Sequence, residues 1–351
     1  MKVAITGETG FLGYHLTQYL KYQLKYEVIE LTRDYQSNIN LIKECDWLIH
    51  CAGINKNLSV NNNNVVLANE LIRLLNNNNI KINIAYASSI QEYLNNEYGL
   101  DKAAAGDILK SYCSRFNQKF ISYKLPNLFG PFGKPNYNSV VSTFCYNIAN
   151  DNICQINNNI IDLCYVYDAI QVMNLNDTDH LYITNNISVN NLYIKLKDFH
   201  ENYSKGIIPK LYTNFDIQLF NTYRSFVKCK HEFNKYTDER GHLGELLKSK
   251  GSESHMFFST TAPGVTRGNH FHFNKVERFC ILKGTANVSM RKLGTSKVIS
   301  YIIEETNNTV IDIPILYTHN ITNIGDSDLI CVFWTNEIFN IEIPDTYYIN
   351  V

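Results

Sequence analysis

The chain has 351 residues, which is more than one hydrophobic core usually serves, so two domains are expected. Its formal net charge of −1 gives no long-range field to recruit nucleic acid or an anionic membrane, so the expected partners are small molecules. The nine cysteines form no CxxC pair, and no signal peptide precedes the first predicted strand. These features indicate a reduced, cytoplasmic compartment. No apolar run reaches the roughly 18 residues typical of a membrane span.

Residues 1 to about 130 alternate short β-branched runs with longer helical stretches. This alternation is typical of βαβ units and predicts an α/β fold with a doubly wound, Rossmann-type parallel sheet. The predicted strands are residues 3–6, 27–31, 47–50, 83–87 and 120–125.

The pattern then changes twice. A strand at 163–167, a segment at 182–184 and two helices predict a small substrate-covering lobe, whose last helix should hold Leu219, Tyr223 and Phe226. From about residue 228, strands recur every 8 to 12 residues with hardly any helical periodicity, which predicts an all-β domain. We therefore expect an α/β domain with its lobe at 1–227 and a β-domain at 228–351, with glycine-bearing turns at Gly264, Gly284, Gly294 and Gly325.

The opening segment KVAITGETGFLGYHL places three glycines between a predicted strand and an amphipathic helix. Glycines there let the backbone approach a pyrophosphate at the positive end of the helix, and this context favours a dinucleotide site over an ordinary turn. Arg33 follows the second strand and favours NADPH, because its guanidinium can pair with a 2′-phosphate, although Arg33 could also be solvated beside Asp34. The predicted cofactor-binding residues are Gly7, Gly10, Phe11, Leu12, Gly13, Arg33, Cys51, Ala52, Gly53, Tyr98 and Lys102.

Tyr98 and Lys102 lie four residues apart in a predicted helix and so share one face. The ammonium group is expected to lower the pKa of Tyr98, which would give a proton to a carbonyl oxygen as hydride arrives. In ASSIQ, at the end of the preceding strand, Ser89 is in register with the hydroxyl that orients the carbonyl in the short-chain reductase superfamily. This resemblance makes Ser89 the predicted third catalytic residue, with Ser88 as the alternative.

The segment KLPNLFGPFGKPNYNS resembles the region where extended short-chain reductases contact a nucleotide-sugar. The resemblance makes Asn127 the expected substrate-binding residue, with Asn136 and Asn138 as weaker candidates that could equally be turn residues beside Pro135. Arg224 and Lys228 could contact the diphosphate or be solvated on the last helix.

The segment GVTRGNHFHFNKVERFCILKG contains two histidines two residues apart, which project to one face of a strand. On an unbroken strand, Glu277 would point to the opposite face from the two histidines. A turn near 273–275 must therefore bring its carboxylate to their side. A later strand supplies His319. The predicted metal ligands are therefore His270, His272, Glu277 and His319, a set that leaves solvent positions open for Lewis-acid chemistry. The alternative is a metal-free barrel with packed histidines.

These residues match the two motifs of the cupin superfamily, which implies a jelly-roll fold. The second motif departs from the pattern at Leu316, where glycine is usual, so we expect an altered turn there. The ligand types suit zinc, iron, nickel, cobalt or manganese. For removal of a substrate proton, Lys275 and Tyr317 are candidates, but packing or surface roles are favoured for both. Arg267 could hold a phosphate or brace the loop.

The whole chain resembles the bifunctional capsular-polysaccharide enzymes that make UDP-2-acetamido-2,6-dideoxy-L-talose, the precursor of UDP-N-acetyl-L-fucosamine. The resemblance rests on the order of reductase then cupin, and on the motifs ASSIQ, YGLDK, PNYNSVVSTFCYNIA, TRGNHFH, KVERF, HNITN, FWTNEIF and PDTYY. It implies a UDP-linked 4-keto-6-deoxy amino sugar, epimerised at carbon 3 in a zinc-binding cupin and reduced at carbon 4 with NADPH.

A homodimer or higher homo-oligomer is also expected. The sequence is compatible with two rival functions: a single-activity reductase with a cupin for dimerisation or stability, and a sensor that binds NADPH without turnover. The Ser/Tyr/Lys set argues against the sensor.

Overall fold

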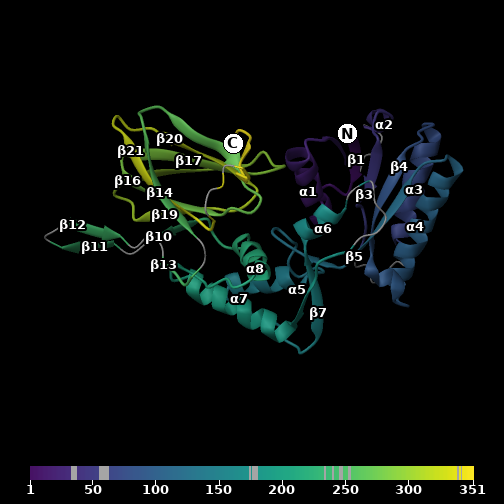
Figure 1. Ribbon diagram of the computed structural model, residues 1–351, viewed down its shortest axis with the longest axis horizontal. Coiled ribbons are helices and arrows are strands. Elements are labelled where there is room, and N and C mark those ends of the chain that lie inside the picture. The colour runs from purple at the N-terminus through teal and green to yellow at the C-terminus, as the bar shows by residue number, and fades with distance from the viewer. Residues whose placement is uncertain are drawn as a thin grey trace. The chain divides into compact units, whose positions relative to one another are not determined.

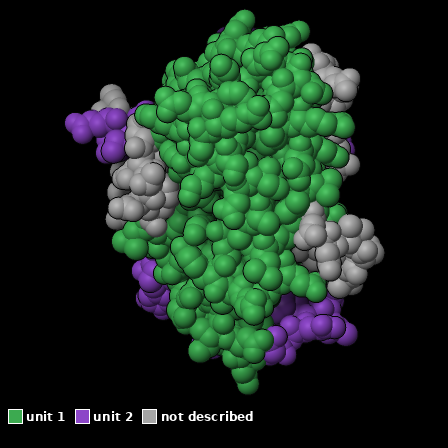
Figure 2. Space-filling view, turned by 90° about the vertical axis from the view of Figure 1, so that its right-hand side faces the viewer, with its two compact units in different colours: residues 1–143, 158–189 green, residues 144–157, 190–351 purple. Residues whose placement is uncertain are grey.

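Two units can be separated in the computed structural model by their internal contacts (Figure 2). The first comprises Met1–Thr143 and Asn158–Val189, and the second Phe144–Asn157 and Asn190–Val351. The structure describes residues 1–32, 38–54, 63–173, 175, 181–232, 235–238, 241–244, 248–251, 254–337, 340 and 342–351.

A five-stranded parallel sheet forms the centre of the first unit, in the order β2-β1-β3-β4-β5 (Figure 1). The predicted strands are confirmed, with β4 running two residues further than expected. Because the order reverses beside β1, the carboxyl ends of β1 and β3 lie at the edge where such sheets bind ligands. The strands are β1 (Lys2–Thr6), β2 (Glu27–Leu31), β3 (Trp47–His50), β4 (Asn83–Ser89) and β5 (Phe120–Leu125).

Helices α3 (Asn63–Asn77) and α4 (Glu97–Arg115) pack against this sheet. Leu71 and Leu75 of α3 and Leu109 of α4 share a core cluster with the strand residues Leu48 and Ile84. The unit also contains α1 (Phe11–Gln18) with a π-helical extension at Tyr19–Gln23, α2 (Ile39–Ile42), a 3-10 helix at Ile90–Tyr93, and α6 (Val166–Val172).

A second sheet of the first unit holds β6 (Asn127–Phe129), β7 (Ile160–Tyr165) and β8 (Asn185–Ser188). The predicted strand at 163–167 is wrong at its end, because residues 166 and 167 already belong to α6. Asp168 lies in the first turn of that helix, where a negative charge is favourable. The predicted segment at 182–184 is not a strand, and the strand begins just after it.

The second unit begins its helical part with α5 (Val140–Ala149), which starts in the first unit, and continues with α7 (Val189–Tyr203) and α8 (Asn214–Arg224). A capping box between Thr213 and Asp216 starts α8. Leu219 and Tyr223 are buried on α8 as expected, whereas Phe226 lies beyond its end.

Two antiparallel sheets share one core in the rest of this unit (Figure 1). Their orders are β10-β19-β16-β21-β14 and β18-β17-β20-β15-β22. The strands are β10 (Lys230–Glu232), β14 (His255–Thr261), β15 (Thr266–Phe271), β16 (Glu277–Lys283), β17 (Thr285–Lys292), β18 (Val298–Glu304), β19 (Thr309–Ile313), β20 (Tyr317–Asn323), β21 (Leu329–Thr335) and β22 (Tyr347–Tyr348).

Two short strand pairings lie outside these larger sheets. Strands β11 (Lys235–Asp238) and β12 (Gly241–Gly244) form a hairpin, and β9 (Ile207–Ile208) pairs with β13 (Lys248–Ser249). The mostly antiparallel β-region is as expected, while its assignment as a jelly roll stays a prediction. The contacts group α7 and α8 with these strands; the predicted boundary at 227/228 stays a prediction. No helix in the described ranges is long and apolar enough to cross a membrane.

Candidate catalytic and metal sites

The glycine turn after β1 is packed backbone against backbone. Gly7 has a φ of 72°, and a Cβ added there would come within 2.5 Å of the Ala52 nitrogen. A Cβ at Gly13 would lie 2.0 Å from the Gly7 carbonyl oxygen. Gly10 is the N-cap of α1 and supplies no side-chain cap, so the first N–H groups of this helix suit a pyrophosphate. Phe11 and Leu12 form the first turn of α1.

The segment after β3 lies beside the carboxyl end of β1. Ala52 donates its N–H to Thr6 Oγ1 at 3.3 Å, and a Cβ on Gly53 would lie 3.0 Å from Lys102 Nζ. Burial raises the pKa of the Cys51 thiol to about 12, so this group is a neutral thiol and a poor nucleophile. Arg33, the residue predicted to select NADPH, lies outside the described residues.

Helix α4 carries both Tyr98 and Lys102, as predicted. Lys102 Nζ donates a hydrogen bond to the carbonyl oxygen of Ala87 at 3.0 Å and lies 5.0 Å from the centre of the Tyr86 ring. Burial lowers the pKa of Lys102 to about 8. Lys102 is thus fixed against the end of β4.

The expected lowering of the Tyr98 pKa is wrong for this structure. Burial raises the pKa of Tyr98 to about 12, and the negative charge of Asp101 adds to the effect. Desolvation is the largest cause of this shift. The phenol is protonated over the working pH range, which is the form required of a proton donor.

The two serines at the end of β4 make different contacts. Ser88 donates to Glu92 Oε1, and the other carboxylate oxygen of Glu92, Oε2, lies 3.3 Å from Lys124 Nζ. Ser89 accepts the N–H of Gln91 at 3.2 Å and caps the 3-10 helix. The hydroxyl of Ser88 is thus committed to Glu92, which leaves the Ser89 hydrogen available to a substrate oxygen.

The three predicted substrate asparagines are exposed. Asn136 has a φ of 54°, and its N–H donates to Thr143 Oγ1 at 3.0 Å, so its backbone has the geometry of a turn residue. The two readings suggested for Arg224 are both wrong: Arg224 is buried and lies 3.5 Å from Asp312, so it is neither solvated nor open to a diphosphate. Lys228 is exposed.

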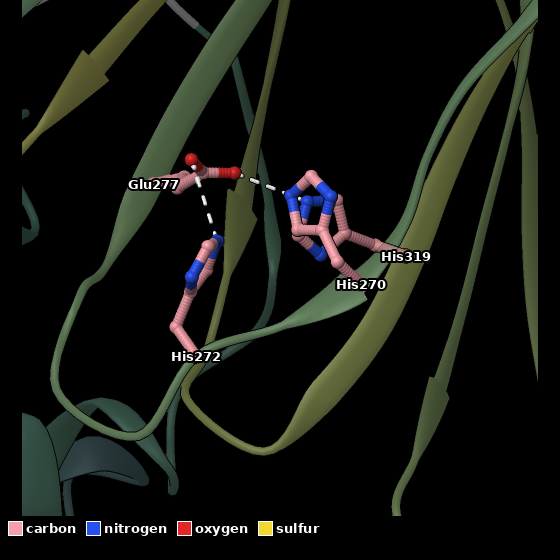
Figure 3. Close-up of side chains that lie close together, drawn as sticks. All are labelled: His270, His272, Glu277 and His319. Carbon is pink, nitrogen blue, oxygen red and sulfur yellow. Dashed lines mark ion pairs between the residues drawn. The ribbon is translucent and has the colours of Figure 1, made fainter. Parts of the chain in front are cut away.

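Four side chains converge between the two sheets of the second unit (Figure 3). His270 lies on β15 directly opposite His319 of β20, His272 follows β15, and Glu277 begins β16 of the other sheet. One ligand-type atom from each residue lies within 4.8 Å of all the others. Glu277 Oε2 is 3.0 Å from His319 Nε2, and Oε1 is 3.5 Å from His272 Nε2.

The protonation of the cluster suits a cation. Burial, together with His319 and His272, lowers the pKa of His270 to about 3, so this imidazole is neutral. Burial alone would raise the pKa of Glu277, but its contacts with His272 and His319 hold that pKa well below its usual range. The result is a neutral His270 imidazole beside an ionised carboxylate, and imidazole together with carboxylate is the donor set that divalent transition metals prefer.

A buried ring nitrogen without a hydrogen bond shows whether the four residues fit a metal ion. Within the described part of the chain, the buried Nε2 of His272 makes no hydrogen bond. Its Nδ1 lies 2.5 Å from the carbonyl oxygen of Asp345, and His319 Nδ1 lies 3.3 Å from the carbonyl oxygen of Tyr317. A carbonyl oxygen can only accept a hydrogen bond, so each ring donates from Nδ1, and its Nε2 is the atom that would bind an ion. The four residues therefore fit a divalent metal ion.

The turn expected near residues 273–275 is present between β15 and β16. The predicted alteration of the turn at Leu316 is wrong. Leu316 has a φ of 61°, the left-handed conformation that glycine adopts easily, and its N–H donates to the carbonyl oxygen of His272 at 2.9 Å. The turn keeps the glycine geometry with a fully buried leucine in place.

The residues next to the candidate metal ligands make structural contacts. Lys275 is buried, and its Nζ donates to the carbonyl oxygen of Pro344 at 3.2 Å. Arg267 Nε donates to Thr261 Oγ1 at 3.1 Å, a contact that braces its strand. Burial raises the pKa of Tyr317 to about 12, so its phenol is not a base.

Two acidic residues near these sites were missed from the sequence. Asp101, inside the YGLDK motif, accepts the N–H groups of Asn64 and Val65 at 3.0 and 3.1 Å and the Asn64 side-chain amide at 2.7 Å. Asp345, inside PDTYY, contacts the turn that carries His272. Both lie in motifs quoted above, but their partners are far away in sequence.

A relative with known activity covers the whole chain. The UDP-2-acetamido-2,6-beta-L-arabino-hexul-4-ose reductase of Pseudomonas aeruginosa is 33% identical over 371 aligned residues, which cover 100% of this chain and 99% of the relative. The chain belongs to the same family as this reductase.

Other comparisons agree with this family. Residues 3–176 match the NAD dependent epimerase/dehydratase family, and residues 236–347 match the polysaccharide biosynthesis C-terminal domain. The crystal structure of the capsular polysaccharide assembling protein CapF from Staphylococcus aureus is similar over 100% of both chains, with 29% identity and a TM-score of 0.61. A probable low-salt glycan biosynthesis epimerase, Agl13 of Haloferax volcanii, is 29% identical over 119 residues, covering 31% of this chain and 76% of that protein.

Proposed function

We propose that this reductase-family chain is a bifunctional nucleotide-sugar enzyme. Its substrate is a UDP-linked 2-acetamido-2,6-dideoxy-L-hexos-4-ulose, which the β-region epimerises at carbon 3 and the first unit reduces at carbon 4 with NADPH. The product is the UDP-L-talose amino sugar used for capsule or O-antigen polysaccharide. The name of the Pseudomonas relative, a reductase of a UDP-linked 4-ulose, supports the reduction.

The reduction rests on the groups gathered around β4 and α4. NADPH, when bound at the glycine turn, supplies the hydride. Tyr98, which its burial keeps protonated, donates a proton to the oxygen on carbon 4. Lys102, fixed on the Ala87 carbonyl, provides positive charge beside the reacting centre, and Ser89 orients the carbonyl oxygen.

The cluster of His270, His272, Glu277 and His319 carries the epimerase proposal. A divalent ion, which we expect to be zinc, supplies a Lewis acid there. The protein contributes three imidazoles, one carboxylate and a largely buried setting between two sheets, in which charge developing on a substrate oxygen is stabilised. The base that removes the carbon 3 proton is not assigned.

The two steps have a required order. The proton on carbon 3 is acidic only while carbon 4 is a ketone, because the ketone lets the negative charge spread onto oxygen as an enolate. Once carbon 4 is an alcohol, this stabilisation is lost. Epimerisation should therefore precede reduction, and the final product should not be epimerised.

The test follows deuterium at carbon 3 in heavy water by NMR. A Tyr98→Phe protein given the keto substrate should incorporate deuterium with or without NADPH, while hydride transfer falls steeply. A protein with both His270→Ala and His272→Ala should lose most bound metal and the exchange, yet keep NADPH-dependent reduction. Exchange that needs Tyr98, or that survives loss of the ligands, would overturn this division of labour.

A single-activity reductase is the second candidate, since the printed name of the Pseudomonas relative gives only a reductase. In that case the β-region would serve dimerisation or stability. Reduction that survives metal removal, without deuterium exchange and with no change in product configuration, would favour it.

A further inference from the structure

One residue near the end of the chain holds the turn between β15 and β16. The carboxylate of Asp345 accepts the backbone N–H groups of Phe273, Asn274 and Lys275 at 3.0, 2.8 and 2.8 Å. Three donors on one carboxylate satisfy most of its hydrogen-bonding capacity and fix the course of the turn. This turn joins His272 to Glu277, two members of the candidate metal cluster.

The main chain of Asp345 contacts the imidazole ring of His272, one of the four candidate metal ligands. The carbonyl oxygen of Asp345 lies 2.5 Å from His272 Nδ1, and the residue has a φ of 39°. Aspartate tolerates this left-handed region better than most residues do. Asp345 therefore binds the turn with its side chain and orients the imidazole of His272 with its backbone.

Neighbouring contacts keep Asp345 in place. Lys275 Nζ donates to the carbonyl oxygen of Pro344 at 3.2 Å and to Thr346 Oγ1 at 3.5 Å. The following strand, β22, pairs with β15, where Tyr348 stands opposite His270. The C-terminal segment is thus held at two places, by Lys275 of the turn and by the pairing of β22 with β15.

We propose that Asp345 is a positioning residue of the metal centre, which sets the tautomer and direction of His272 and the spacing between His272 and Glu277. The proposal rests on the proposed metal-binding function of the cluster. Outer contacts of this kind change metal affinity by about 10- to 100-fold in other sites.

The experiment measures zinc affinity of the full-length protein by competition with a chromophoric chelator. Asp345→Ala should weaken zinc binding about 10- to 100-fold, and Asp345→Asn, which keeps one acceptor oxygen, should weaken it less. The exposed Asp326→Asn is the matched control and should bind zinc as the unsubstituted protein does. The visible spectrum of bound cobalt should change with Asp345→Asn and stay the same with Asp326→Asn.

The outcomes separate the two proposals. Unchanged zinc affinity and cobalt spectrum in both Asp345 variants would overturn the role of Asp345. If the unsubstituted protein binds zinc no better than a His270→Ala variant, the metal-binding function itself fails. If Asp345→Ala does not fold, the affinity and spectrum of Asp345→Asn decide, because an amide preserves the shape of the side chain.

Discussion

Arg278 and Asp312 stand opposite each other in the register of β16 and β19 and form a forked ion pair. Asp312 Oδ1 accepts from Nε at 2.6 Å and Oδ2 from Nη2 at 2.9 Å. Tyr203 of α7 also donates to this carboxylate, and Arg224 of α8 lies 3.5 Å from it. All four side chains are buried, so one carboxylate joins two helices to the β-sheet of the second unit.

Asp312→Ala should destabilise the protein by about 3–5 kcal/mol, because two buried guanidinium groups lose their counter-charge. The measurement is urea unfolding, followed by tryptophan fluorescence; Trp334 is buried on β21 of the same sheet. Asp326→Ala, at an exposed position of the same unit, is the control and should unfold at the unsubstituted midpoint. Equal midpoints for the two variants would show that the pair adds little.

The pH dependence of reduction should follow Lys102. Its pKa is lowered to about 8 by burial, so the ammonium group is present below this pH and is lost as the pH rises through it. We expect kcat/KM, which reports the free enzyme, to fall above pH 8. Tyr98, with a pKa of about 12, stays protonated throughout this range. Lys102→Arg keeps its charge and should move the decline upward; a flat profile to pH 10 in the unsubstituted enzyme would contradict the assignment.

Asp101 should affect cofactor binding through Asn64. Asp101 holds the first turn of α3, and Asn64 in turn accepts the Ile54 N–H at 3.1 Å and donates to the Ile54 carbonyl at 3.2 Å, beside Gly53. Asp101→Ala should raise the KM for NADPH about tenfold, the equivalent of one hydrogen bond to a charged group of roughly 1.5 kcal/mol. Asp107→Ala, exposed on the same helix, is the matched control. If both variants have the same KM, Asp101 does not position the cofactor segment.

Arg33 is expected to select NADPH, a prediction that rests on the sequence alone. Arg33→Ala should raise the KM for NADPH by tenfold or more and leave the KM for NADH nearly unchanged, since only NADPH has the 2′-phosphate that the guanidinium pairs with. Initial rates with each cofactor measure the effect. A similar rise for both cofactors would mean that Arg33 has no part in the choice.

The first sheet was predictable because buried parallel strands form short apolar runs that stand out between helices. Four of the five strands differ from the prediction by at most one residue, and β4 continues to Ser89. The end of β7 was missed because Val166 and Tyr167 are as compatible with a strand as with the helix that they begin.

The four clustered side chains were also predictable, because two histidines at strand spacing, a carboxylate after a turn and a later histidine form a pattern. The contacts around them were not. Asp345 lies 73 residues from His272, and Arg224 meets Asp312 only after α8 has packed on the sheet. Nor does the spacing of Tyr98 and Lys102 reveal how deeply the phenol is buried, which decides the direction of its pKa shift.

Leu316 shows that a motif can keep its shape after losing its characteristic residue. A leucine with a φ of 61° bears backbone strain of about 1–2 kcal/mol, which the burial of its side chain offsets. Glycine would relieve the strain but leave a cavity. A search pattern that demands glycine at this position would therefore pass over chains of this kind, whereas one that demands the following histidine and a buried residue here would retain them.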